Sequence, residues 1–374
     1  MGRTAIIVGG GIAGLSAAIA IRQAGYAVTL FERAPKLEPI GAALSVWGNA
    51  MAGLDWLGCG DAVRARAHPV RSLCLRRADD RVLWGPVDVA GTDSWLPMRS
   101  DLQAALLATL GTDACRLGVH VDALSEHGGR VVLRAAGEPV AEAELVVVAD
   151  GVRSPTGSAL IGNPPGFRGY VGVLGIAHGA SDGEAGLGEE IWSERDRFGL
   201  FDGGEGRRYW FYMAPAADAH AAAPDHAALL ARVAAFPERV GRAVAATDPA
   251  SLIALAINAR AAPRRLGRGR VICIGDAAHA MEPNQGQGGC QGIEDAWALG
   301  VLAQRLPPEA ILPELERLRL GRIRRAMFDS ALVGRAAHAP SGLVRAGLRA
   351  LLRLPPPRID RRQFLGRIAV PHYA

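Results

Sequence analysis

Lysine, cysteine and long apolar runs are scarce or absent in this chain of 374 residues. The five cysteines are scattered and odd in number, and no two form a CxxC pair, which excludes a disulfide framework and a structural zinc site. No run of about 18 apolar residues occurs, and the first residues lead directly into a strand-like run without a signal-peptide pattern. We therefore expect no metal site, no membrane span, no secretion, and a location in the reducing cytoplasm.

The positive charge of the sequence is almost entirely arginine. The formal net charge is +5, and only Lys36 among the 42 basic residues is a lysine. These residues form no stripe interleaved with aromatic residues, which argues against a nucleic-acid partner. Residues 301–374 hold 14 arginines against 5 acidic residues, so the basic excess lies in the C-terminal segment. With 49% hydrophobic residues the chain is too apolar to be disordered, and its length allows two domains.

The hydrophobic pattern predicts an α/β core that is interrupted and then resumed. Residues 4–8 and 27–31 are apolar runs typical of strands, and 12–24 has the pattern of a small-residue helix. This βαβ opening indicates a parallel sheet with crossover helices. Further apolar strands are expected at 145–149 and 270–274. Additional elements of this part are a strand at 131–133 and helices at 50–57 and 102–110.

Residues 167–213 have Gly-rich turns and short alternating segments, which predict an antiparallel sheet. Alternation places Tyr209 and Phe211 on one face and Trp210 and Tyr212 on the other, so only one pair can face a pocket. Helices are expected at 224–235 and 309–333.

A last helix is expected at 341–354, where Arg345, Arg349 and Arg353 recur every four residues. A basic amphipathic helix of this kind can lie on a membrane surface. We expect instead that it packs on the core and turns its arginines to solvent.

A glycine-rich turn follows the first strand. Its sequence, Gly9-Gly10-Gly11-Ile12-Ala13-Gly14, has GxGxxG spacing between a strand and a helix, and Glu32 ends the next strand. Gly9 permits the tight turn, Gly11 lets the backbone approach a pyrophosphate at the helix N-terminus, and Gly14 lets helix and strand pack closely. Glu32 would accept hydrogen bonds from a ribose. The pattern predicts dinucleotide binding but does not separate FAD from NAD.

Two other strands end in acidic turns, Asp150-Gly151 and Gly275-Asp276. The second opens a long segment, Gly275-Asp276-Ala-Ala-His-Ala-Met-Glu-Pro283-Asn-Gln-Gly286-Gln-Gly288-Gly289. With this segment the chain resembles the single-component (class A) FAD-dependent aromatic hydroxylases, most closely the salicylate-, urate- and zeaxanthin-type members. The resemblance covers about residues 3–330.

The resemblance implies a discontinuous FAD-binding domain with a Rossmann-like parallel sheet of the glutathione-reductase type. Its expected parts are residues 1–70, 98–160 and 265–330. An antiparallel-sheet substrate domain would comprise 71–97 and 165–260, and 331–374 would be a helical C-terminal segment.

Several residues receive cofactor roles through this resemblance. Asp276 would hold a ribityl hydroxyl, and the turn at Gly286, Gly288 and Gly289 would open a helix whose N-terminal dipole faces the flavin pyrimidine. Pro283 would lie near the reactive face of the flavin.

Asp150 would serve both FAD and the nicotinamide cofactor. Arg99, just before a helix, would contact FAD. Alternatively, Arg99 is an ordinary residue at the start of that helix. Arg33 is a candidate for the adenosine phosphates. Gly157 stands where relatives carry an arginine, so this chain lacks that arginine's contribution to nucleotide binding. His279 is expected to be a loop histidine bonded to backbone rather than a general base.

The substrate is expected between the flavin and the antiparallel sheet. Arg197 and Tyr209 match polar positions on the corresponding strands of relatives and are our candidates for substrate contact, although a structural role is the more common one for such residues. The remaining aromatic candidates on these strands are Trp192, Phe198, Trp210, Phe211 and Tyr212.

The resemblance implies an enzyme that uses FAD, NADPH or NADH and O2 to hydroxylate a small aromatic or heteroaromatic compound through a flavin C4a-hydroperoxide. FAD would be bound tightly but not covalently, and the nicotinamide cofactor transiently, since no second GxGxxG occurs. Epoxidation or Baeyer-Villiger-type oxidation of a polycyclic or isoprenoid substrate remains an alternative, as does a flavin-binding redox scaffold without turnover. We expect a monomer or a homodimer.

Overall fold

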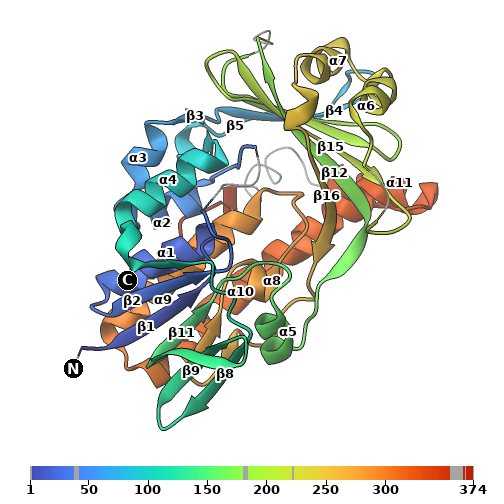
Figure 1. Cartoon of the computed structure of the whole chain (residues 1–374). Helices are drawn as coiled ribbons and strands as arrows, with labels where there is room; N and C mark the ends of the chain where they lie inside the picture. The colour runs from blue at the N-terminus through green and yellow to red at the C-terminus, as the bar shows by residue number, and fades with distance from the viewer. Residues whose placement is uncertain are drawn as a thin grey trace.

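The computed structural model describes residues 2–37, 42–179, 184–220, 223–353, 365–366 and 368–373. Two lobes are visible in Figure 1, one built on a parallel sheet near both chain ends and one built on a large second sheet. The long helix α10 (Pro308–His338) runs from the first lobe to the second. This arrangement confirms the predicted fold class.

The first lobe contains a six-stranded sheet in the order β17-β18-β11-β1-β2-β7. The β1, β2, β11 and β18 strands are neighbours in parallel register, as the βαβ pattern predicts, and β17 pairs antiparallel at the edge. Its strands are β1 (Thr4–Val8), β2 (Ala27–Glu32), β7 (Cys115–Leu117), β11 (Leu145–Val148), β17 (Gly267–Arg268) and β18 (Val271–Cys273).

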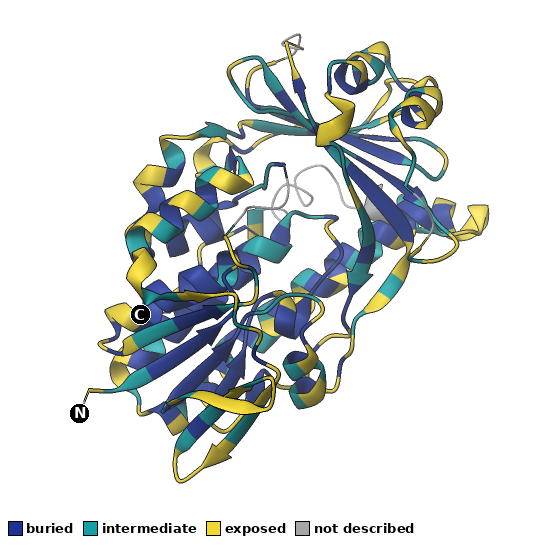
Figure 2. Cartoon of the chain, viewed as in Figure 1, coloured by how far each residue is buried: buried dark blue, intermediate teal, exposed yellow. Residues whose placement is uncertain are grey.

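Helices cover this sheet because their apolar faces are buried against it. The α1 helix (Ile12–Gln23) is almost wholly buried between the sheet and α9 (Gln287–Arg305), and both stand out as buried in Figure 2. The remaining helices of this lobe are α2 (Gly48–Leu57), α3 (Gly60–Arg64), α4 (Arg99–Leu110), α5 (Pro155–Ile161) and α8 (Asp276–His279).

The strand expected at 131–133 exists but does not belong to the main sheet. It is part of β9 (Arg130–Ala135), which pairs with β8 (Ala123–His127) and β10 (Glu138–Ala143) in a separate antiparallel sheet. Figure 2 shows that this small sheet has a largely exposed outer side.

The second lobe is a seven-stranded sheet in the order β16-β12-β15-β14-β13-β4-β5. Its neighbours are antiparallel except β4 and β13, which run parallel. The strands are β4 (Ser72–Arg77), β5 (Val82–Asp88), β12 (Gly166–His178), β13 (Leu187–Trp192), β14 (Arg197–Asp202), β15 (Arg207–Pro215) and β16 (Ile253–Ala259). A two-stranded ribbon, β3 (Ala67–Pro69) and β6 (Trp95–Pro97), lies between the lobes.

One face of this sheet packs on α6 (His226–Val233) and α7 (Glu238–Ala245). Trp210 and Tyr212 are buried on that side, and the Trp210 indole donates a hydrogen bond to Thr247. The opposite face carries Tyr209 and Phe211 toward the first lobe, so the alternation expected from the sequence is confirmed.

The last helix, α11 (Gly342–Arg353), corrects the expectation of an arginine-rich solvent face. Arg345 donates to the carbonyls of Ala339 and Pro340, and Arg349 donates to the carbonyl of Ala336. A helix C-terminus has unpaired carbonyls and a partial negative charge, so the end of α10 attracts both guanidinium groups. Leu343 is instead 87% exposed, and the side chain of Arg353 lies outside the described residues. None of the described helices is long and apolar enough to cross a membrane.

Candidate active site

A cavity of about 1780 Å³ lies between the two lobes. Single-ligand pockets are typically about 300–1,000 Å³, so this one has room for more than one molecule. Most of the residues predicted for the site line it: Gly11, Ile12, Ala13, Arg99, Arg197, Tyr209, Asp276, Pro283, Gly286, Gly288 and Gly289. The other predicted residues are not part of this lining: Gly9, Gly14, Glu32, Arg33 and Asp150.

The glycines at the N-terminus of α1 have different surroundings. Gly9 has φ +107°, and a Cβ there would overlap the carbonyl of Ala149. A Cβ at Gly14 would overlap the carbonyl of Gly9. A Cβ at Gly11 would meet nothing within 4 Å and would project into open space. Gly9 and Gly14 are therefore required by the fold, whereas the empty space at Gly11 fits the backbone approach of a pyrophosphate.

Glu32 holds the glycine turn. Its carboxylate accepts hydrogen bonds from the backbone N–H of Gly10 (2.6 Å) and of Ala34 (2.8 Å). Both bonds fix the chain at the carboxyl ends of β1 and β2, where a dinucleotide binds in open α/β sheets.

Asp150 follows β11 between the cavity-lining residues Ala149 and Gly151. Its Oδ1 is buried and has no hydrogen-bond partner among the residues that the structure describes, and burial raises the pKa of this carboxyl. An unpaired buried acceptor is costly, so it fits a donor from a ligand.

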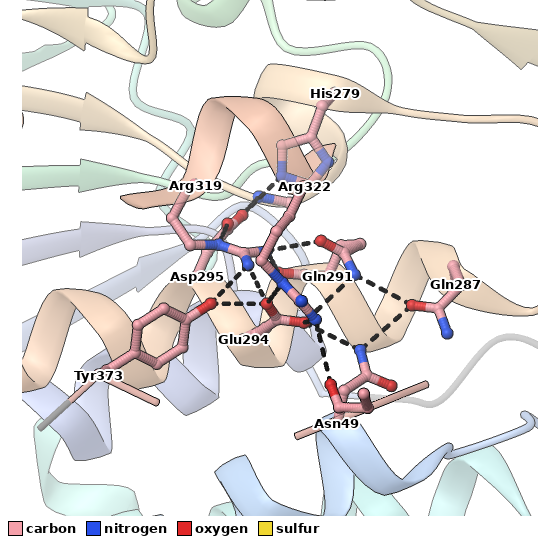
Figure 3. A network of polar contacts seen from close by, with 11 residues as sticks. Asn49, His279, Gln287, Gln291, Glu294, Asp295, Arg319, Arg322 and Tyr373 are labelled. Carbon is pink, nitrogen blue, oxygen red and sulfur yellow. Dashed lines mark hydrogen bonds and ion pairs between the residues drawn. The ribbon is translucent and has the colours of Figure 1, made fainter. Parts of the chain in front are cut away.

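A buried ionic network around Asp295 and Arg319 holds the turn that carries Asp276 (Figure 3). Asp295 accepts hydrogen bonds from the Gly275 N–H (3.0 Å), from His279 Nε2 (2.6 Å) and from Arg319 Nε (2.8 Å). Burial would raise the pKa of Asp295, but the charges of His279 and Arg319 and these hydrogen bonds lower it to about 2. Asp276 itself is exposed at the cavity wall.

His279 departs from its expected surroundings. It ends the short helix α8, is 1% exposed, and bonds to the Asp295 carboxylate rather than to backbone. The partner lies on another helix, which the local sequence does not reveal.

The same network supports the N-terminus of α9. Glu294 interacts with Arg319, Arg322 and Asn49, and Asn49 in turn donates to Gln287 in the first turn of α9. Gly286 precedes this helix with φ +63°, and a Cβ at Gly288 would meet only one atom, at 4.0 Å. The helix N-terminus therefore presents backbone N–H groups to an open part of the cavity, as a flavin edge requires.

Arg197 contacts the segment of Pro283, which lies just before α9. Arg197 is 1% exposed, and its Nη2 donates a 2.6 Å hydrogen bond to Oδ1 of Asn284, the residue after Pro283. Its Nη1 lies 3.1 Å from the Glu190 carboxylate, and its guanidinium stands 5.6 Å from the Phe211 ring centre. Within the described part of the chain, its Nε has no hydrogen-bond partner. A buried cation with a spare donor is thus placed beside Pro283.

Tyr209 lines the same cavity among aromatic residues. Its ring lies 6.1 Å from that of Phe201 and 6.4 Å from that of Phe211, centre to centre. Burial raises the pKa of the Tyr209 hydroxyl, so this group is a donor at neutral pH.

Sequence reasoning did not single out several lining residues. These are the segment 42–45, Asn284, Arg349 and the residues of β4 and β5 between Leu73 and Asp88. Asn284 stands next to Pro283 and carries a recognisable polar side chain, whereas β4 and β5 reach the cavity only through the pairing of distant strands.

Comparison with known proteins identifies the family. Residues 3–311 match the family described as an FAD binding domain. The chain is 34% identical to aurachin C monooxygenase/isomerase of Stigmatella aurantiaca over 333 residues, which are 87% of this chain and 86% of the relative. It is 32% identical to an FAD-dependent urate hydroxylase of Klebsiella pneumoniae over 335 residues, 86% of each.

The fold matches that of a solved relative over nearly its full length. Klebsiella pneumoniae HpxO complexed with FAD and uric acid superimposes with a TM-score of 0.88 and 26% identity, covering 98% of this chain and 96% of that one. The chain therefore belongs to the single-component (class A) FAD-dependent monooxygenases, which use FAD together with NAD(P)H.

Proposed function

We propose that this protein hydroxylates a small aromatic or heteroaromatic compound that carries an acceptor oxygen. The observation that carries the proposal is the buried Arg197 guanidinium, which stands beside Pro283 and against the ring of Phe211, in a cavity that Tyr209 also lines. A planar ring fits an aromatic wall, and a carboxylate, phenolate or carbonyl oxygen fits a desolvated guanidinium. The relatives named for urate and for aurachin C support a ring substrate.

FAD, when bound, activates O2 with two electrons supplied by NADPH or NADH, so that one oxygen atom enters the substrate and the other leaves as water. In our assignment the backbone at Gly11 receives the pyrophosphate, while Asp150 and Asp276 bind hydroxyl groups of the cofactor. The N-terminus of α9 at Gly286, Gly288 and Gly289 stabilises negative charge on the reduced ring. Gly9, Ile12, Ala13, Gly14 and Glu32 shape the turn, and Arg33 and Arg99 act as cationic partners of the phosphates.

Arg197 fixes the acceptor oxygen of the substrate, and Tyr209 donates a second hydrogen bond to the same ring system. Pro283 would lie next to the reactive face of the flavin. The protein therefore orients the substrate and excludes water, while the cofactor carries the oxygen chemistry.

The cavity size favours one alternative, epoxidation or Baeyer-Villiger-type oxidation of a polycyclic or isoprenoid compound. Hydroxylation and this alternative differ in which compounds accelerate NAD(P)H oxidation. Phenolic compounds accelerate flavin reduction if the enzyme is an aromatic hydroxylase, and do not if its substrate is polycyclic or isoprenoid.

The test is NADH and NADPH oxidation by FAD-loaded protein with phenols, benzoates, quinolones, purines and polycyclic aromatics, with hydrogen peroxide and oxygenated product measured together. We expect a ring compound to accelerate NAD(P)H oxidation and to yield one molecule of hydroxylated product for each NAD(P)H consumed. Acceleration by polycyclic or isoprenoid compounds alone, with epoxide or ester products, would replace the proposal by its alternative.

A further inference from the structure

The cavity face of the seven-stranded sheet extends well beyond the Arg197 site. Cross-strand registers align one row of residues across six strands: Leu174, Phe211, Gly199, Glu190, Leu75 and Trp84. Strands lie about 4.8 Å apart, so this row is about 24 Å wide. One aromatic ring at Phe211 covers only part of it.

Polarity divides this face. The ion pair of Arg197 and Glu190 lies on the central strands β14 and β13. Beyond it, toward β4 and β5, most of the lining residues are apolar, and Asp88 at the end of β5 is an acidic one. We call this region the apolar wing: Leu73, Leu75, Trp84, Trp192, Leu332 and Val333.

Two elements enclose the apolar wing. Leu75 and Val333 pack against the buried Trp192, which joins the sheet to α10. Leu332 and Phe328 continue the same side of α10 along the cavity, and Phe328 is 64% exposed. Polar residues also line this end. Arg325 and Asp329 of α10 form an ion pair. The guanidinium of Arg349 lies 5.3 Å from the Trp192 ring centre and donates to the carbonyls of Ala336 and Glu194.

Leu73, Leu75 and Trp84 are only partly buried although they belong to a sheet face that lines an interior cavity. Apolar surface left facing solvent in a cavity binds apolar groups, because its removal from water is favourable.

Resting on the function proposed above, we propose that the substrate is an aromatic ring with an apolar arm, the ring oxygen held at Arg197 and the arm lying in the apolar wing. The arm is an alkyl or prenyl chain of several carbons, since it passes from β14 over β13 and β4 toward β5. The substrate class is thus an amphiphilic aromatic compound rather than a compact polar one.

The test uses 4-alkylphenols and 4-alkylsalicylates with methyl, butyl, hexyl and octyl arms. Dissociation constants are measured from the perturbation of the bound flavin spectrum, and NAD(P)H oxidation and product are measured in parallel. Each buried methylene is expected to tighten binding about two- to fourfold, so affinity rises steeply with arm length until the wing is filled.

Two matched variants locate the arm. Leu75→Asn places an amide in the apolar wing, whereas Leu255→Asn makes the same change at a half-buried lining position on β16, at the other edge of the sheet. Leu75→Asn is expected to abolish the gain per methylene, and Leu255→Asn to preserve it. FAD content and thermal unfolding show that both variants are folded.

The outcomes separate the two proposals. If short-arm compounds bind and are hydroxylated but affinity does not rise with arm length, the arm proposal is overturned and the proposed function stands. If the gain is lost equally in both variants, the arm lies elsewhere and the placement is wrong. If no compound of either series perturbs the flavin or accelerates NAD(P)H oxidation while a compact ring compound of the panel above does, the arm proposal is overturned and the proposed function stands. If the whole panel fails as well, the proposed function fails together with the inference.

Discussion

Asp295 and His279 are joined by a 2.6 Å hydrogen bond between two side chains that are 0% and 1% exposed. The same carboxylate holds the N–H of Gly275, the residue before Asp276. The stability of this pair is therefore coupled to the geometry of the turn that we assign to FAD.

The pH dependence of unfolding follows from this pair. The pKa of Asp295 is lowered in the folded protein from its ordinary value to about 2, so its carboxylate stabilises the fold above the unfolded pKa. This contribution, about 2 kcal/mol, is lost as the pH falls from about 5 to 2. We expect the free energy of unfolding to fall more steeply over this range in the native protein than in Asp295→Asn. Parallel pH curves for the two proteins would contradict this assignment.

Gly11→Val should separate folding from cofactor binding. The added side chain projects into open space in the protein, so the fold should survive, whereas a pyrophosphate would meet it directly. A steric cost of about 1–3 kcal/mol corresponds to FAD binding weakened roughly 10- to 100-fold. Gly321→Val, at a second position with nothing within 4 Å, is the control. FAD affinity is measured by fluorescence titration. A Gly11→Val protein that binds FAD as tightly as the native protein would refute the role of Gly11.

Arg197→Met should weaken substrate binding. The change removes a hydrogen bond to a charged group, which is worth about 1.5–3 kcal/mol, so the dissociation constant of an acceptor-bearing substrate should rise roughly 10- to 100-fold. FAD affinity should stay the same. Arg317→Met, at an exposed arginine of α10, is the matched control, and equal effects of the two substitutions would exclude Arg197 from the substrate site.

Tyr373→Phe should destabilise the first lobe although Tyr373 is not part of the cavity lining. The Tyr373 hydroxyl donates to Glu294 Oε1 (2.6 Å) and accepts from Arg319 Nη1 (2.7 Å). Loss of these charge-assisted bonds costs about 1.5–3 kcal/mol, measurable as a lower denaturant midpoint. His372→Ala, at the exposed neighbouring residue, should leave the midpoint within error. An unchanged midpoint in Tyr373→Phe would show that the network does not depend on this hydroxyl.

The sequence predicted those features that depend on local spacing. The strand-turn-helix at Gly9 to Gly14 follows from short-range backbone geometry, and the placement of Tyr209 and Phe211 on one face follows from the two-residue period of a strand. The sequence did not predict the partner of His279, because it is a carboxylate on a different helix. It did not predict where the Arg349 side chain lies either, because that side chain bonds to the C-terminal end of α10. The parallel pairing of β4 with β13 has the same origin.

The strand order of the first lobe bears on how the protein is made. The β11 and β18 strands are neighbours, yet five of the seven strands of the second sheet, β12 to β16, are encoded between them, and β4 and β5 come earlier still. A chain emerging from the ribosome therefore completes the large sheet before β18 and α9 exist. Domains fold as their residues become available, so the large sheet forms while its cavity face is still exposed. FAD can therefore bind only at the last stage of synthesis.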